Sequence, residues 1–254
     1  GAALTSAARC ILIGSDAGND LTTATDAIFI GHGAGDGHDT EVRNIGIGLN
    51  ALGGVVAGGE YNICIGGQAG ATNTTGDKNI IIGDTAGGDN TTGSAGVFIG
   101  YDAGGANTTG YGNIYIGLDA GDANTEGGGN IGIGINTVGQ SDTENTNYGI
   151  GYGSLQGAIA GGEQNTAYGY YGFKDLTSAD DGVAIGYEAG KATTTGGHNT
   201  FVGFQAGAQS TTGAGNTIVG YGCDVGAVDA GPTLVFGYNI SGAANDFSFG
   251  KVSN

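Results

Sequence analysis

Methionine and tryptophan are absent from the 254 residues, and proline occurs once. Lysine and arginine together number six against 24 acidic residues, so the formal net charge is −18 at pH 7. A chain this acidic is repelled by nucleic acid and by anionic membranes, and neither is an expected partner. There is no run of 18 apolar residues and no basic leader before an apolar stretch, so neither membrane insertion nor a signal peptide is predicted. The absence of methionine leads us to expect a processed product or a piece of a longer protein.

Glycine, by contrast, accounts for 59 residues, and its spacing is regular. A glycine follows a mostly apolar triplet in every repeat, and we number this anchor glycine as position 0. The anchors are Gly14, Gly31, Gly48, Gly66, Gly83, Gly100, Gly117, Gly134, Gly151, Gly169, Gly186, Gly203, Gly220 and Gly237. Neighbouring anchors lie 17 residues apart, except for 18 between Gly48 and Gly66 and between Gly151 and Gly169. This register indicates a repeat architecture.

Each repeat contains one short strand and two turn signals. Isoleucine or valine prevails at positions −3 and −1, which share one face of a strand, as in Ile80 and Ile82. Alanine is common at +3, and Thr-Thr-Gly recurs further on, as at 74–76. Seventeen residues are too few for a strand, a helix and their connections, and the glycine content opposes helix. The sequence predicts an all-β fold, a parallel β-solenoid (β-roll) of about 14 rungs with a 17-residue repeat.

Within this solenoid we expect the isoleucines to stack along the axis and the anchor glycines to supply corners with positive φ. Residues 1–10 are predicted to be a lead-in segment, 11–238 the β-solenoid domain and 239–254 an exit or capping segment. Phe247 and Phe249 are expected to cover the open end. Leu52 and Leu155, in the two 18-residue repeats, are expected to fill space at an alternative corner.

Asparagine at position −4 is interpreted as structural, because it tolerates left-handed backbone and can form amide ladders along a corner. A row of ligand-binding asparagines is the less favoured alternative. The asparagines are Asn44, Asn62, Asn79, Asn113, Asn130, Asn147, Asn165, Asn199 and Asn216.

Position −2, on the opposite strand face from the isoleucines, is also apolar or glycine, as in Phe98, Tyr115 and Gly132. A position that faces solvent is normally polar. The strand is therefore expected to be buried on both faces, inside the coil and against another chain. An intimate homotrimer around a three-fold axis fits best, because identical rungs then meet identical rungs.

The cysteines, a cluster of histidine and aspartate, and an acidic row are the polar or reactive residues that could form a site. Cys10 and Cys64 lie about three rungs apart, roughly 14 Å at the strand spacing, whereas a disulfide needs about 7 Å or less, so no intrachain bridge is predicted. His32, Asp36, His38 and Asp39 are ligand types at no known metal spacing, and solvated loop residues are the favoured interpretation.

An acidic row includes Asp102 and Asp119, with Asp84 nearby and Asp16 and Glu188 in the same frame. A solvated stripe is favoured for this row over a divalent cation site or a catalytic pair. We predict no catalytic, cofactor-binding or metal-ligating residue, although a bound divalent cation stays open.

Aromatic residues occupy position +1 in six successive repeats. They are Tyr152, Tyr170, Tyr187, Phe204, Tyr221 and Tyr238. Stacked rings support one another along a solenoid, which is the favoured interpretation. An exposed aromatic row can also contact a glycan, and this remains the alternative.

The repeated unit N-x-x-I-G-x-x-A-G-x-x-x-T-T-G resembles the repeats of bacteriophage tail fibres over about residues 11–237. It is similar, more loosely, to the β-roll heads of trimeric autotransporter adhesins. The closing A-N-D-F-S-F-G-K-V-S-N resembles the segment that leads into a self-cleaving intramolecular chaperone of the endosialidase type. The resemblance implies a homotrimer with a host-binding role, and no receptor-binding residue lies in the shared motif.

These observations favour a structural and host-attachment protein rather than an enzyme. We expect a trimeric tail fibre in the virion, outside the cell, that contacts other tail proteins and a glycan or protein on the host surface. A bacterial surface adhesin is the alternative, which a membrane anchor encoded downstream would identify. A capsule-degrading enzyme is less favoured, because the acidic row is not paired with a recognisable cleft. An ice-binding solenoid is also less favoured, because adjacent threonines point to opposite strand faces.

Overall fold

The computed structural model describes residues 9–54, 59–139 and 142–251 and forms two compact units, residues 1–129 and 130–254. Within the described residues every regular element is a β-strand. The chain is a parallel β-solenoid of about 14 turns with a repeat of about 17 residues, which confirms the predicted all-β solenoid. In the described part of the chain there is no helix that could span a membrane.

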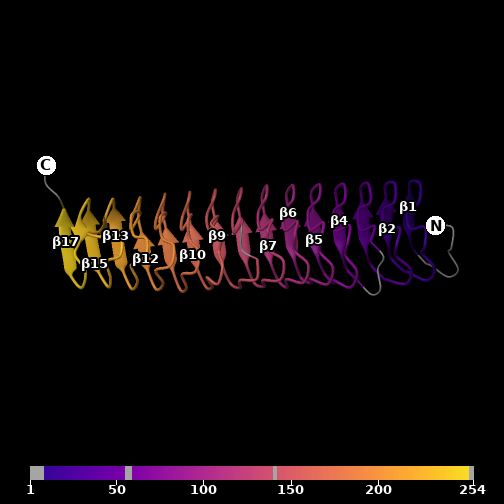
Figure 1. Cartoon of the computed structure of the whole chain (residues 1–254). Helices are drawn as coiled ribbons and strands as arrows, with labels where there is room; N and C mark the ends of the chain where they lie inside the picture. Colours follow the sequence, from indigo (N-terminus) through magenta and orange to yellow (C-terminus); the bar gives the residue numbers. More distant parts are fainter. Residues whose placement is uncertain (1–8, 55–58, 140–141, 252–254) are drawn as a thin grey trace. The chain divides into compact units, whose positions relative to one another are not determined.

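The first unit stacks one short strand per rung, in chain order (Figure 1). The strands are β1 (Ile11–Ile13), β2 (Ile28–Ile30), β3 (Ile45–Ile47), β4 (Ile63–Ile65), β5 (Ile80–Ile82), β6 (Val97–Ile99) and β7 (Ile114–Ile116). Each pairs in parallel with the next, and equal repeat positions face each other, so Ile63 pairs with Ile80. The register follows the sequence repeat because each rung contributes its strand at the same position.

The second unit continues the same pattern with longer strands toward its end. Its main sheet contains β8 (Ile131–Ile133), β9 (Tyr148–Ile150), β10 (Thr166–Tyr168), β11 (Val183–Ile185), β12 (Thr200–Val202), β13 (Thr217–Tyr221), β15 (Leu234–Tyr238) and β17 (Phe247–Lys251). A second sheet pairs β14 (Asp224–Val225) with β16 (Ser241–Gly242). Phe247 and Phe249 on β17 are 60% and 80% exposed, so the expectation that they cover the open end is wrong.

The core lies on the strand face opposite to the one predicted. Position −2 is buried on every rung after the first, where Leu12 is half-buried, and Phe29, Ile81 and Phe201 are each at 0% exposure. Isoleucines at −1 point outward, and Ile13 and Ile185 are 59% and 40% exposed. The prediction that the isoleucines stack inside and that −2 faces outward is therefore wrong. Because successive side chains of a strand point to opposite faces, an interior −2 places −3 and −1 on the outer face.

The interior side chain alternates between two positions of the rung. On most rungs +4 is glycine where −2 is large, and +4 is large where −2 is glycine or alanine; the exceptions are Ala184–Gly190, Ile218–Asp224 and Val235–Ser241. The first group comprises the pairs Phe29–Gly35, Cys64–Gly70, Ile81–Gly87, Phe98–Gly104, Tyr115–Gly121 and Phe201–Gly207, and the second Gly46–Leu52, Gly132–Val138, Gly149–Leu155 and Ala167–Phe173. A Cβ on Gly35 would lie 2.5 Å from the Phe29 ring. The predicted space-filling role of Leu52 and Leu155 is confirmed, since both are fully buried.

The anchor glycines make the predicted corners. Gly83 has φ of +143°, and a Cβ there would lie 2.1 Å from the carbonyl oxygen of Gly100, the next anchor. Two further corners, at −5 and +2, adopt left-handed backbone with non-glycine residues, as in Lys78 (φ 58°) and Thr85 (φ 56°). Glycine is thus required at position 0 by both its φ and its contact, and is optional at the other corners.

The asparagines at −4 form the expected buried ladder. Asn79 Oδ1 accepts a hydrogen bond from Gly96 N at 2.8 Å, and Asn79 Nδ2 donates to Gly93 O at 2.9 Å. Asn62 Oδ1 accepts from Asn79 N in the same way. The left-handed residue is the neighbour at −5, here Lys78, rather than the asparagine, which corrects one part of the prediction. The ladder satisfies buried backbone groups that the short strands leave unpaired.

Candidate functional site

The aromatic residues at +1 form a continuous stack in the second unit. Ring centroids are 5.2, 5.1, 5.1, 4.8 and 5.1 Å apart from Tyr152 to Tyr238, and the interplanar angles are 4–12°. The six side chains are 38–46% exposed. The predicted stacking is therefore confirmed. Because each inner ring has a neighbour on both faces, ring edges and phenol oxygens face outward, and glycan contact by this row stays a prediction.

Tyr171 packs against this stack and lies close to two lysine side chains. Its ring centroid lies 4.3 Å from that of Tyr170, at an interplanar angle of 57°. Lys174 Nζ and Lys191 Nζ lie 5.5 and 5.8 Å from the centroid of Tyr171. These two cations belong to a total of only six in the chain. The polar surface beside the aromatic stack therefore holds a third of all lysine and arginine.

The acidic row of the first unit lies at a left-handed corner. Asp102 and Asp119 occupy position +2 with φ of 53° and 51°, whereas Asp84 occupies +1. Aspartate tolerates this backbone, which gives the row a structural reason. Asp102 and Asp122 border a hollow of about 380 Å³. Burial, with the nearby Asp119 and Asp102 carboxylates, raises the pKa of Asp122 to about 6.

The structure separates the four residues considered for a metal site near the start of the chain. His32, at +1, is exposed, with Nε2 3.8 Å from Asp16 Oδ2. His38, at +7, is fully buried, and its ring centroid lies 5.1 Å from that of Phe29. No group of three metal-ligating side chains occurs among the residues that the structure describes. Burial lowers the pKa of His38 to about 4, so its imidazole is neutral near pH 7.

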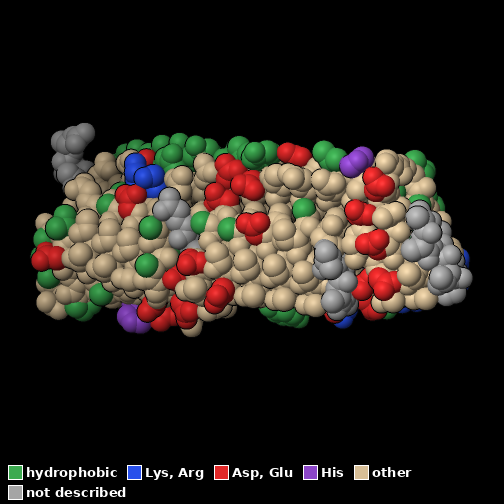
Figure 2. Space-filling view, turned by 45° about the vertical axis from the view of Figure 1, so that its right-hand side comes forward, with side chains coloured by type: hydrophobic (Ala, Val, Ile, Leu, Met, Phe, Trp, Pro, Cys, Tyr) green, Lys and Arg blue, Asp and Glu red, His purple; other side chains and the backbone are tan. Residues whose placement is uncertain are grey.

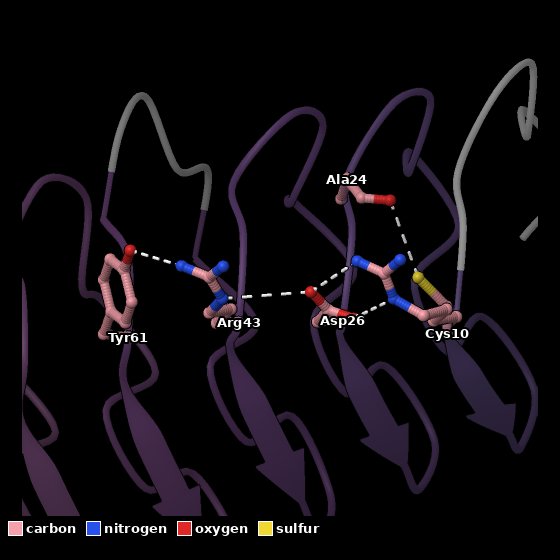
Figure 3. Close-up of polar contacts among 6 residues, drawn as sticks. Cys10, Ala24, Asp26, Arg43 and Tyr61 are labelled. Carbon is pink, nitrogen blue, oxygen red and sulfur yellow. Dashed lines mark hydrogen bonds and ion pairs between the residues drawn. The ribbon is translucent and has the colours of Figure 1, made fainter.

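Corner residues at −5 form a charged row in the first unit, which Figure 3 shows. Arg9 Nη2 donates to Asp26 Oδ2 at 2.9 Å, and Arg43 Nη1 donates to Tyr61 Oη at 2.6 Å. Hydrogen bonding from Arg9 lowers the pKa of Asp26. Since these side chains are exposed, the row contributes little to stability, and screening by salt weakens it further.

The cysteines occupy interior or ladder positions. Cys64 and Cys223 are buried, no disulfide is present, and the predicted absence of a bridge is confirmed. Burial raises the pKa of Cys64 well above its ordinary value. Cys10, at position −4, donates from Sγ to Ala24 O at 3.6 Å, as an asparagine amide does elsewhere (Figure 3).

Two features escaped sequence reasoning. Asparagines at +7 form a second buried ladder, in which Asn107 Nδ2 donates to Asn90 Oδ1 at 2.8 Å. The recurrent Asn before Thr-Thr-Gly was the signal for it. The second feature is a polar groove beside Tyr171, whose lining residues differ from rung to rung and so leave no repeated pattern.

Comparison with protein-family models, with curated proteins and with solved structures found no match to this chain.

Proposed function

We propose that the chain is part of a homotrimeric attachment fibre of the kind that the resemblance to bacteriophage tail fibres implies. It would act outside the cell, as part of a virion, and contact other tail proteins and a glycan or protein on the host surface. The observation that carries the proposal is an apolar outward face on the strands. The structure's solenoid architecture supports a structural role, because its repeated rungs supply length and one periodic surface.

The outward strand face, defined here as positions −3, −1 and +1, is apolar at −1 on every rung and is also apolar at −3, at +1 or at both. The polar exceptions are Ser15, His32 and Asp84 at +1 and three threonines at −3. Ile80 at −3 is 39% exposed, Ile133 at −1 is 37% exposed, and Tyr101 at +1 is 55% exposed. Figure 2 shows hydrophobic side chains gathered along one edge of the visible surface. Contiguous apolar surface of this kind marks an interaction site in soluble proteins.

Copies of the same chain are the partner that fits this face. Its rows repeat at the strand spacing of about 4.8 Å, and only a partner with the same spacing can match them rung by rung. Another copy of the chain has this spacing. A parallel arrangement around a three-fold axis places identical positions together and buries the face of each protomer.

The test is the mass of the protein in solution, measured by light scattering coupled to size exclusion. We expect a mass near three times 24.6 kDa. Replacing Ile65 and Ile82 by aspartate should yield monomers, because charges would be buried on the outward strand face. Replacing the exposed Thr75 and Thr92 by aspartate adds the same charge elsewhere and should leave the mass unchanged.

A monomeric wild-type protein would overturn the self-association. A mass near two copies would keep the interface and overturn the three-fold arrangement. Circular dichroism of both variant proteins checks that the solenoid is intact, so loss of association can be separated from loss of folding.

A further inference from the structure

A polar groove runs along the second unit between corner +2 and position +6 of successive rungs. Its larger part has a volume of about 420 Å³. Small residues form its floor, including Ala192, Ala208 and Gly222. Its polar lining comprises Asp175, Glu188, Lys191, Gln205, Gln209, Asp224 and Ser241.

The groove is elongated along the stacking direction. A second hollow, of about 380 Å³, is lined by Gln156, Gly157, Lys174 and Asp175, so the two hollows share Asp175. Lys174 and Lys191 both occupy position +5, on neighbouring rungs. A groove that continues over several rungs accommodates a linear ligand better than a compact one.

Hydrogen bonds from neighbouring side chains and from the backbone hold the polar side chains of the groove in place. Glu188 accepts hydrogen bonds from Lys191 Nζ and from Gln205 Nε2, both at 2.8 Å. Asp224, which is 7% exposed, accepts from the backbone N of Gln209 at 2.9 Å and from its neighbour Val225. Groups fixed before binding lose less freedom when a ligand arrives.

Charge in the groove is nearly balanced. Lys191 pairs with Glu188 at 2.8 Å, and Lys174 pairs with Asp175 at 2.9 Å. Both lysines of the groove are therefore paired, and the net charge of −18 repels an anion. Carboxylate, ammonium and amide groups instead present acceptors and donors side by side, which suits a ligand rich in hydroxyl groups.

We propose that this groove binds a neutral saccharide chain through hydrogen bonds to its hydroxyl groups. Glu188, Gln205 and Gln209 would make the contacts at the centre of the groove, and Lys174 with Asp175 would extend them along the chain. The inference rests on the proposed attachment function and gives it a ligand class. It places the ligand at +2 to +6, outside the outward strand face, so self-association leaves the groove accessible.

The test is affinity electrophoresis of the full chain in gels that contain dextran, starch, galactomannan or alginate. We expect at least one of the three neutral polymers to retard the protein, and alginate, which is anionic, to leave it unretarded. Replacing Gln205 and Gln209 by alanine should weaken retardation at least tenfold in apparent affinity. Replacing Thr195 and Thr212 by alanine, on an exposed row outside the groove, should not change it.

Several results would overturn the proposal: no retardation by any neutral polymer, retardation by alginate alone, or full retardation of the Gln205→Ala, Gln209→Ala protein. The proposal would also be overturned if a Tyr187→Leu, Tyr221→Leu protein lost retardation while the Gln205→Ala, Gln209→Ala protein kept it. That result would assign the binding to the aromatic stack. Thermal unfolding verifies that each variant is folded. Light scattering on the same samples shows separately whether self-association, and with it the proposed function, has failed.

Discussion

At single positions of this repeat, the backbone conformation and the available space restrict the residue type more than its polarity does. At position +7, which points into the coil, the structure accepts Leu21, His38 and Asn73 alike, all buried to within 1%. Position 0 accepts glycine alone, because of its φ and because of the next anchor's carbonyl oxygen. The position of a histidine in the repeat therefore determines its exposure: His32 at +1 is exposed and His38 at +7 is interior.

His38 gives a prediction about pH at the residue scale. Its pKa of about 4 in the folded state lies below the ordinary value of 6.5, so the unfolded chain binds more protons between these values. Stability is therefore lost as pH falls from 6.5 to 4, by on the order of 3 kcal/mol. His38→Leu, which copies Leu21 of the preceding rung, should remove this loss.

Urea unfolding of both proteins at pH 7, 5.5 and 4.5 measures the effect as the difference between their free energies of unfolding. Asp122, with a pKa raised to about 6, acts in the opposite direction, since its stabilisation falls as pH rises from 3.8 to 6. It is present in both proteins and cancels in the difference. His32→Gln, which replaces an exposed histidine, is the matched control, and parallel profiles for wild type and His38→Leu would refute the prediction.

At the scale of one rung, the sequence period determined most of the architecture. Anchor spacing placed every three-residue strand in the first unit, because a solenoid rung can hold its strand in only one register. The period could not decide which strand face is inside, since Ile80, Ile81 and Ile82 are all apolar. The alternation of large and small residues between −2 and +4 identifies the interior strand face, because only interior positions must share a fixed volume.

The exchange predicts strong coupling between Gly46 and Leu52. Leu52→Gly alone removes a fully buried side chain and should cost about 3–5 kcal/mol of unfolding free energy. Gly46→Ile alone should also destabilise, because a Cβ added there would lie 2.9 Å from the carbonyl oxygen of Ala51 and 3.0 Å from the Phe29 ring. The double variant reproduces the Ile81–Gly87 arrangement and should recover about 1–3 kcal/mol relative to the sum of the single changes.

Denaturant unfolding of the four proteins completes this double-mutant cycle. Gly46→Ile combined with Thr75→Ala, at an exposed position, is the matched control and should show simple additivity. Additive free energies for Gly46→Ile and Leu52→Gly would show that the two positions do not share one space. The candidate groove offered no comparable signal in the sequence, because its residues vary from rung to rung.

At the scale of the whole molecule, charge opposes folding and association together. The chain has 24 acidic residues against six basic ones, and ion pairs with carboxylates engage four of these cations, Arg9, Arg43, Lys174 and Lys191. Such exposed pairs contribute little to stability, so their screening by salt costs little, whereas salt also screens the repulsion among all the remaining carboxylates. Sodium chloride should therefore stabilise the protein, in contrast to a protein whose stability depends on ion pairs.

We expect the melting temperature to rise by roughly 3–6 °C between 0.02 and 0.5 M sodium chloride, which corresponds to about 1–2 kcal/mol for a chain of this size. Replacing the exposed Glu126 and Asp229 by glutamine and asparagine reduces the negative charge by two and should reduce this rise. Sucrose at equal osmolality separates screening from general solute exclusion. A melting temperature that falls with salt would mean that the exposed ion pairs outweigh the net repulsion. Charge repulsion would then oppose self-association through the apolar outward strand face less than the net charge of −18 indicates.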